Sequence, residues 1–362
     1  MGSLSRRNTS VEILRILAMF LIVLSHYVVH SGVINTELSL GFNKFLFEVG
    51  SLGNIGVILF VLITGYYSIG KSNPFKLKKL MSIICQVLFY SLTFYSLFCA
   101  LGMEHFSVIE FIKNIFPITF KQYWFVTAFV VLYIVAPYIN VLLNNLSRKR
   151  HLQFLIISLI LFSVFPTLTA QSFYGNELVQ FILFYSIGAY LKKYKNNFFS
   201  NKKNAWLMII GCSMIIIASI IVFDLLGTHW DIFGKYSNYL LNRNSIVSIA
   251  LSVSVFSLFT KKKPFTNNII NTVAGCTFGV YMISDNCYVR HVLWTSILNI
   301  PSFANSPILF LHLICSVLVV YSICSVIEFI RLNTLERLFS SVYDSIEQKI
   351  KKWLSIKKKK LL

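Results

Sequence analysis

Three ionisable side chains interrupt the first apolar run of the sequence: Glu12, Arg15 and His26. A charged group near the centre of a bilayer costs at least about 2.5 to 3.5 kcal/mol on insertion scales, so such a residue needs a partner, an aqueous cavity or a function. Histidine titrates near neutral pH and can accept a proton from a substrate, whereas a guanidinium can hold an anion or polarise a carbonyl group. The chemistry that these residue types offer is proton transfer beside a bound anion or carbonyl.

Helical geometry places these side chains on one face of the segment. The eleven steps from Arg15 to His26 turn an α-helix by about 1,100°, which leaves an offset of about 20°, and they advance about 16 Å along its axis. Glu12 precedes Arg15 on the same face, and Met19 and Ile22 lie between the two ends of the stripe. The alternative is purely structural: Arg15 extends to lipid phosphates with Glu12 as its partner, and His26 makes one interhelical hydrogen bond.

The composition is that of a chain whose main solvent is lipid. Of its 362 residues, 56% are hydrophobic and 13% are charged, and the mean hydropathy is +0.71. The net charge of +20 does not indicate a nucleic-acid partner, because the basic residues lie in short clusters between apolar runs and not along one continuous stripe. The seven cysteines show no CxxC spacing. We therefore expect neither a disulfide framework nor a metal site.

The apolar runs predict an all-α polytopic membrane protein with about ten transmembrane helices. A helix needs about 20 apolar residues to cross a hydrocarbon core of about 30 Å. The sixth run is short and the ninth carries polar residues. The predicted spans are residues 11–31, 45–69, 80–102, 123–143, 152–170, 178–191, 204–224, 240–260, 269–288 and 308–330.

The basic clusters follow every second span and so indicate how the chain is threaded through the membrane. Lysine and arginine mark cytoplasmic loops, and we therefore expect both termini in the cytoplasm. Residues 1–330 are predicted to form one transmembrane domain. Residues 331–362 combine an apolar helical stripe with flanking lysines, which is typical of a cytoplasmic tail lying on the anionic inner leaflet.

Four stretches of the chain follow a known pattern in a known order. Arg15, ten further residues and His26 come first, and residues 53–66, 123–137 and 278–281 follow. In these stretches the chain resembles the acyltransferase-3 family of bacterial membrane O-acyltransferases, over residues 8 to 330. One position departs from the pattern: many relatives carry a histidine where this chain has Ser284. Any role of that histidine in donor or acceptor binding is expected to pass to the neighbouring aspartate or to be absent.

The resemblance implies transfer of an acyl group, commonly acetyl from acetyl-CoA, to a sugar hydroxyl of an envelope glycan or its lipid-linked precursor. It places the protein in the bacterial plasma membrane, with acyl-CoA, the glycan and the bilayer as partners and without a metal or nucleic acid. His26 is then the candidate base, because a hydroxyl is a poor nucleophile until its proton is removed. Arg15 is the candidate ligand of a donor phosphate or thioester carbonyl. Across the 16 Å between them, either the pantetheine arm of the donor bridges the gap or the acyl group is relayed.

The remaining candidates for substrate binding are Glu12, Asn54, Trp124, Tyr281, Asp285 and Arg290. Asn54 has an interhelical hydrogen bond as its alternative interpretation, and Trp124 has a place in the interfacial aromatic belt as the alternative to a sugar-stacking platform.

Asp285 and Arg290 lie at the outer end of the ninth span and either line the acceptor site or form an ion pair that holds a loop. Two other histidines are interpreted as structural, His30 at the outer interface and His312 as a satisfied helix contact.

Two other functions share the same gross features. A transporter or flippase of lipid-linked glycans also has many spans, large outer loops and basic inner loops, but it usually lines its cavity with charges from several spans. A catalytically degenerate scaffold of an envelope complex would keep the fold without the reaction. The grouping of charges in the first and ninth spans favours the enzyme.

Overall fold

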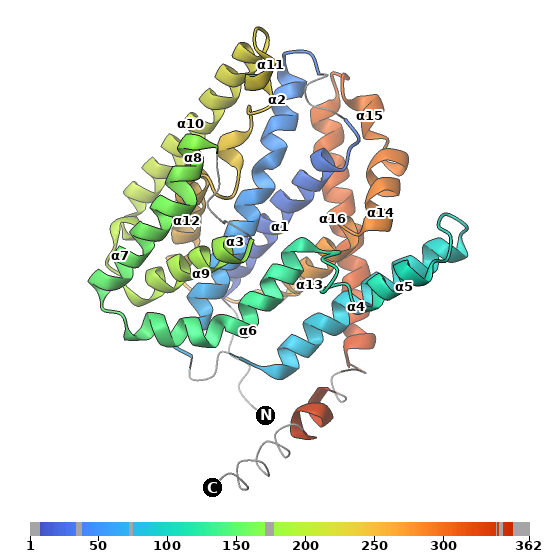
Figure 1. The fold of residues 1–362 in the computed structure, drawn as a ribbon, viewed down its shortest axis with the longest axis horizontal. Coiled ribbons are helices and arrows are strands. Elements are labelled where there is room, and N and C mark those ends of the chain that lie inside the picture. The colour runs from blue at the N-terminus through green and yellow to red at the C-terminus, as the bar shows by residue number, and fades with distance from the viewer. Residues whose placement is uncertain are drawn as a thin grey trace.

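The computed structural model describes residues 8–33, 38–71, 75–170, 177–337, 339 and 343–349, and all regular structure in these ranges is helical. Figure 1 shows the helices as one bundle in which α1 and α3 are central. The α-helices are α1 (Thr9–Val29), α2 (Phe42–Val49), α3 (Gly53–Ser68), α4 (Leu77–Ala100), α5 (Val108–Ile115), α6 (Trp124–Asn145), α7 (Arg148–Leu159), α8 (Phe165–Thr169), α9 (Glu177–Lys193), α10 (Lys202–Gly227), α11 (Asp231–Gly234), α12 (Ile246–Thr260), α13 (Asn268–Ser284), α14 (Cys287–His291), α15 (Ile300–Phe303) and α16 (Leu309–Asn333).

The all-α polytopic prediction is confirmed, and eight helical segments are long and apolar enough to cross a membrane. Segments 178–191 and 269–288, which were predicted as the sixth and ninth spans, correspond to α9 and α13. Each of these helices has 17 residues and falls short of the other eight in length. α9 is buried against α3, whereas α13 packs against α1 and α16 and leaves Ile269 near its start exposed.

Polar contacts at both ends fix the position of α1. Asn8 caps its first turn by accepting a hydrogen bond from the amide of Ser10 at 3.1 Å. Thr9 donates to Asn271 at the start of α13 over 3.0 Å, which makes the two helices begin side by side. At the other end, Tyr27 is hydrogen-bonded to His312 of α16 at 2.8 Å. The interpretation of His312 as a satisfied helix contact is therefore confirmed.

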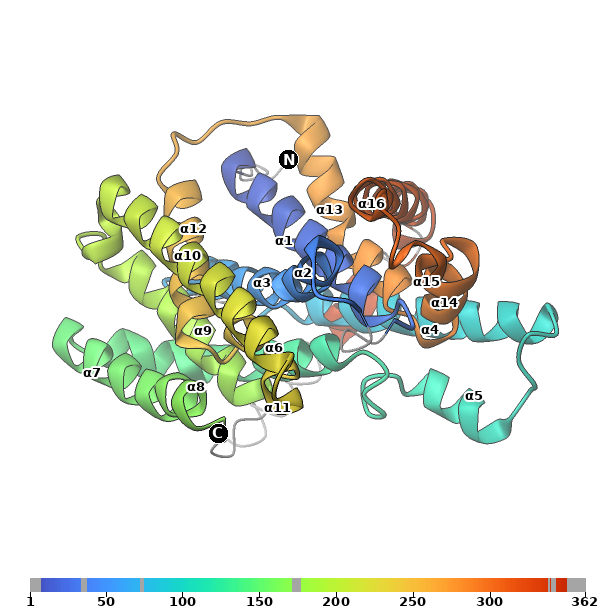
Figure 2. The same ribbon diagram turned by 90° about the horizontal axis from the view of Figure 1, so that it is seen from above.

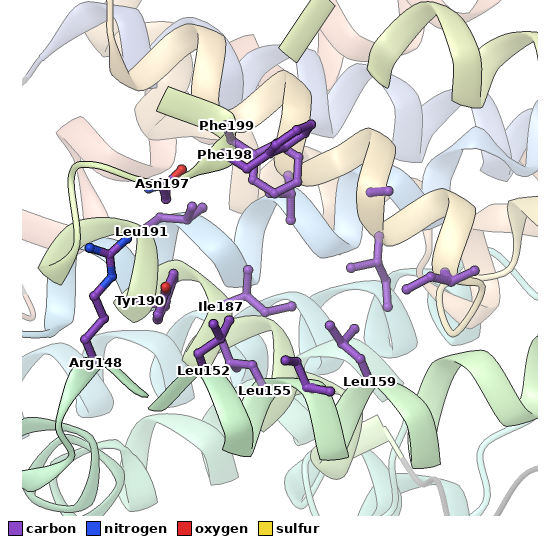
Figure 3. A pocket seen from close by; sticks show the side chains of 15 residues that line it. Arg148, Leu152, Leu155, Leu159, Ile187, Tyr190, Leu191, Asn197, Phe198 and Phe199 are labelled. Carbon is purple, nitrogen blue, oxygen red and sulfur yellow. The ribbon is translucent and has the colours of Figure 1, made fainter. Parts of the chain in front are cut away.

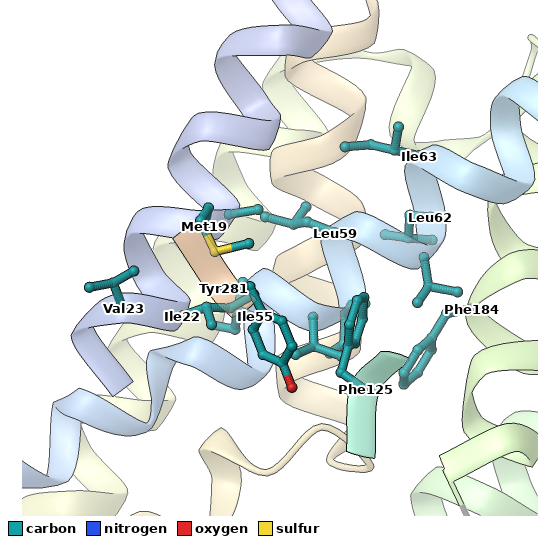
Figure 4. Packing of buried hydrophobic residues seen from close by; sticks show 14 of the residues in the cluster. Met19, Ile22, Val23, Ile55, Leu59, Leu62, Ile63, Phe125, Phe184 and Tyr281 are labelled. Atoms are coloured by element: carbon teal, nitrogen blue, oxygen red, sulfur yellow. The ribbon is translucent and has the colours of Figure 1, made fainter. Parts of the chain in front are cut away.

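Close packing of α1 on α3 completes this arrangement (Figure 4). A Cβ atom at Gly56 would overlap the backbone carbonyl of Ala18, so glycine is what allows the two backbones to approach. The buried side chains around this contact include Met19, Ile22 and Leu59, each at most 5% exposed. The face of α1 that carries Arg15 and His26 cannot rotate without opening this packed core.

A buried ion-pair network joins α4 to α16. The carboxylate of Glu328 accepts hydrogen bonds from Nε and Nη2 of Arg331 at 2.8 and 2.9 Å. It also accepts from Tyr90 at 2.6 Å and from Gln86 at 2.9 Å. Gly279 of α13 packs directly on the Glu328 side chain. Because the charges satisfy one another, the network can lie inside the bundle next to the cavity described below.

The start of α1 and the end of α16 lie on the same side of the bundle, which we call the basic side because the lysine-rich start of α4 lies there too (Figure 1). Lys79 lies over the ring of Tyr133, and Lys192 lies over that of Tyr66. The prediction that both termini face the cytoplasm stays a prediction. Figure 2 shows α5 projecting from one edge of the molecule, away from α7 and α10.

The predicted boundary between domain and tail at residue 330 falls inside a helix, because α16 continues to Asn333. Beyond it, Asp344 forms an ion pair with Lys78 at 2.7 Å. The last part of the predicted amphipathic tail, residues 350–362, lies outside the described residues.

Candidate active site

The ends of α1 and α13 bring two histidines and an aspartate together. His26 lies in the last turns of α1, and Asp285 caps the end of α13, with 8% and 7% of their surface exposed. His30, one turn beyond His26, is hydrogen-bonded through Nε2 to Oδ1 of Asp285 at 2.9 Å. The Nε2 atom of His26 lies 3.8 Å from the same carboxylate oxygen. Two residues proposed from the sequence, His26 and Asp285, thus meet across 259 positions of the chain.

Ser284 determines which nitrogen of His26 carries the proton. The serine hydroxyl donates to the carbonyl of Val280 at 2.8 Å, so it accepts the hydrogen bond that joins it to Nδ1 of His26 at 3.0 Å. Nδ1 therefore carries the hydrogen, and Nε2 presents a lone pair. Ser284 itself thus contacts His26, and the expectation that any binding role of the missing histidine passes to Asp285 or is absent stays a prediction.

The expected ion pair between Asp285 and Arg290 does not form. Within the described residues, Asp285 pairs with His30 and His26, whereas Arg290 is half-buried without a carboxylate partner. The interpretation of His30 as a residue at the outer interface stays a prediction. Its position four residues after His26 sets both rings on one helix face, as the sequence alone indicates. The pairing of the two histidines with Asp285 was not visible in the sequence.

Aromatic and amide groups hold the chain where it leaves α13. Tyr123 donates to the carbonyl of Met282 at 3.2 Å and accepts from Asn286 at 2.6 Å. Trp294 donates from its indole nitrogen to the carbonyl of Ser284 at 3.2 Å. These three side chains, which the sequence did not single out for this role, satisfy a helix end that is buried in the bundle.

A cavity of about 390 Å³ leads from the basic side towards this cluster. Arg15 and Lys79 line one part of it, and Tyr281 lines another, with Met19 and Ile22 between them. The predicted stripe of α1 thus faces an open volume. Figure 4 shows Tyr281 beside Ile22 and Ile55, with its hydroxyl pointing away from Met19.

Tyr281 separates the cavity from His26. Its ring centroid lies 5.8 Å from that of His26 and 5.6 Å from that of Phe125. Only 3% of its surface is exposed, and its buried hydroxyl lies within interaction range of the carboxylate of Asp285. Tyr281 thus connects the end of the cavity to the cluster of His26 and Asp285.

Positive charge surrounds the other part of the cavity. Arg15 contacts both carboxylate oxygens of Glu12 through Nη1, at 3.0 and 3.1 Å, and a third of its side chain remains exposed. The predicted pairing of Glu12 with Arg15 is confirmed. In the loop after α3, partial burial lowers the pKa of Lys71, and the charges of Lys76 and Arg15 lower it further. Such a group of cations favours an anionic ligand.

Two other residues proposed from the sequence lie apart from this cluster. Trp124 is covered by the guanidinium of Arg243, 4.4 Å from the ring centroid, and packs edge-on against Phe181. That face of the indole is therefore not available for stacking on a sugar. Asn54 is half-buried in the first turn of α3, and its side chain makes none of the expected interhelical hydrogen bonds within the described residues.

A second cavity, of about 400 Å³, lies between α7, α9 and α12 (Figure 3). Its lining is almost entirely aliphatic and aromatic, and Arg148 is the charged residue among the described side chains that line it. It contains no group suited to proton transfer or nucleophilic attack. The cavity beside His26 is the one that combines space with chemistry.

The family model described as an acyltransferase domain matches residues 8–327, and the chain belongs to the acyltransferase-3 family. It is a multi-pass membrane acyltransferase, as the resemblance of the Arg15 and His26 stretch implied. No curated protein and no solved structure matches the chain. The roles of the individual residues therefore depend on the geometry described above.

Replacing Ser284 by alanine is expected to change the ratio of the two neutral tautomers of His26. Loss of a hydrogen bond worth about 1 kcal/mol would shift the balance between the two tautomers about fivefold towards the form with hydrogen on Nε2. Nitrogen-15 NMR of histidine-labelled protein measures this ratio, with the His26 signals assigned from a His26→Asn spectrum.

Ser252→Ala is the matched control, because Ser252 is also fully buried and bonded to a carbonyl of its own helix, at 2.7 Å, but contacts no histidine. A wild-type spectrum in which His26 carries its hydrogen on Nε2 would contradict the assignment.

Proposed function

We propose that this protein is a bacterial plasma-membrane O-acyltransferase that moves an acyl group, acetyl in the simplest case, from acyl-CoA to a sugar hydroxyl of an envelope glycan or its lipid-linked precursor. The observation that supports this most is the cavity that runs from Arg15 to Tyr281, with His26 behind the tyrosine ring. The cavity gives an anion a route into the bundle, and this route ends near His26, which can act as a base.

The donor enters from the basic side. Acyl-CoA is a large polyanion with a narrow, extended pantetheine arm that ends in a thioester. Arg15 and Lys79 suit its phosphates, and the mainly apolar wall formed by residues such as Met19, Ile22 and Phe125 suits the arm. This continuous lining favours bridging of the 16 Å gap by the arm over a relay of the acyl group between protein residues.

The acceptor hydroxyl loses its proton to His26. Nε2 carries the lone pair because Nδ1 donates to Ser284, and the resulting imidazolium faces the carboxylate of Asp285. The hydroxyl oxygen attacks the thioester carbonyl and forms a C–O bond. The tetrahedral intermediate then breaks its C–S bond, and the departing thiolate takes the proton back from His26. In this proposal, the hydroxyl of Tyr281 turns to donate a hydrogen bond to the oxyanion of that intermediate.

The arrangement is less suited to the alternatives. A flippase must accommodate a whole sugar-lipid headgroup on its way across the membrane, whereas the apolar part of this cavity is closed by Tyr281, Tyr123 and Phe125 packed against one another. A scaffold without activity would have no reason to keep a lone pair on buried His26 next to Asp285. The enzyme accounts for both features.

Loss of the base is expected to abolish the product. In a deletion strain complemented with His26→Ala, one O-acyl signal in the proton NMR spectrum of purified envelope glycans should stay absent, because general base catalysis contributes about 100-fold or more. Wild type should restore the signal. His229→Ala, which changes an exposed histidine, should also restore it. An unchanged acyl profile in the deletion strain, with lipid-linked glycan accumulating, would instead identify a flippase.

Arg15→Lys is expected to lose most turnover. The lysine keeps the charge but not the planar fork that holds a phosphate or carbonyl through two parallel hydrogen bonds. Transfer of radiolabelled acetyl from acetyl-CoA in membrane vesicles measures the rate, with equal membrane abundance checked by immunoblot. Wild-type turnover in Arg15→Lys would show that the charge alone is sufficient.

Tyr281→Phe removes one oxygen atom and leaves the ring packing intact. If the hydroxyl binds the oxyanion, kcat should fall by about 100-fold with little change in the KM for acyl-CoA. The same vesicle assay over a range of donor concentrations separates the two constants. A rise in KM at constant kcat would make Tyr281 a binding residue for the ground state of the donor.

A further inference from the structure

His26, His30 and Asp285 form a possible set of metal ligands. One ring nitrogen of each histidine and a carboxylate oxygen of the aspartate all lie within 4.8 Å of one another. The histidines are four residues apart on α1, a spacing that directs two imidazoles to one point from a helix. The reaction proposed above does not require three ligand atoms to be directed at one point.

The distances suit zinc. With bonds of about 2.0 to 2.2 Å in a tetrahedron, neighbouring ligand atoms lie about 3.3 Å apart. The carboxylate oxygen of Asp285 is 2.9 Å from Nε2 of His30 and 3.8 Å from Nε2 of His26, distances that lie on either side of that spacing. The ligand atoms of all three residues lie within 4.8 Å of one another, so side-chain rotation must draw them together around the ion.

The surroundings also suit a metal ion. The hydrogen bond from Nδ1 of His26 to Ser284 leaves Nε2 free to bind, which is how histidine ligands are oriented in metal sites. His30 would shift its proton to Nδ1. The fourth position, as in zinc sites with three protein ligands, is left for a water molecule. The hydroxyl of Tyr281, which lies near Asp285 and whose ring lies next to His26, is a candidate partner for that water.

We propose that His26, His30 and Asp285 bind one zinc ion reversibly and that the bound ion inhibits acyl transfer. The metal takes the lone pair of His26 that must accept the proton of the acceptor hydroxyl. Inhibition rests on the proposed function, whereas binding of the metal does not. The protein would then respond to free zinc without any separate regulatory domain.

Binding is tested with cobalt, because tetrahedral Co²⁺ absorbs visible light and Zn²⁺ does not. The full chain, purified in detergent without a histidine tag and treated with a chelator, should develop a visible band that saturates at one Co²⁺ per chain and disappears when Zn²⁺ is added. His30→Gln and Asp285→Asn should lose the band, and His229→Gln, at an exposed histidine, should keep it. A band that is the same in wild type and His30→Gln would overturn the site. Absence of any band in the wild type would do so as well.

Inhibition is tested in the vesicle assay. Metal-free wild type should transfer acetyl, lose activity on addition of Zn²⁺ and regain it with chelator, and the Zn²⁺ concentration for half-inhibition should rise at least about tenfold in His30→Gln. Activity that appears only when Zn²⁺ is supplied would overturn the inhibitory role. A cobalt band in a protein with no transfer activity under any condition would refute the proposed function and leave the metal site standing.

Discussion

Inside a bilayer, a polar side chain without a partner costs free energy, and the first helix of this protein carries several such groups on one face. The hydrogen bond from His26 to Ser284 satisfies one of them. It also couples the rotation of α1 to that of α13, because the two helices begin together at Thr9 and Asn271 and meet again at this bond. The cavity between Arg15 and Tyr281 depends on that parallel pair.

Much of the candidate site could be predicted from helical periodicity and composition. The rest depends on contacts between residues that are far apart in the sequence. The stripe of Arg15 and His26 could be predicted because one helix fixes both angle and rise. The pairing of Asp285 with His30 could not, since residues 255 positions apart leave no trace in local spacing. The role of Ser284 was missed for another reason: a serine in a helix is usually satisfied by its own backbone, and only the approach of His26 gives it a second partner.

The placement of the long helices followed from apolar length alone, and the two short ones show the limit of that criterion. α9 is largely buried among other helices, so packing decides where it lies. α13 packs on α1 and α16, but Ile269 near its start is exposed. Asn54 and Trp124 illustrate the same limit for polar and aromatic residues. Their residue types suggested binding. Arg243, however, covers a face of Trp124, and the side chain of Asn54 has no hydrogen-bond partner within the described residues.

The shortness of α13 affects the membrane as well as the site. Its 17 residues rise about 26 Å, less than the hydrocarbon thickness of about 30 Å. A hydrophobic segment shorter than the bilayer is accommodated by local thinning or by water that enters at its ends. Around α13 the hydrophobic layer is therefore expected to be narrower than in the surrounding lipid. A transmembrane voltage would fall over that shorter path, so that charged groups near the two ends of α13 experience a steeper electric field than they would in the open bilayer.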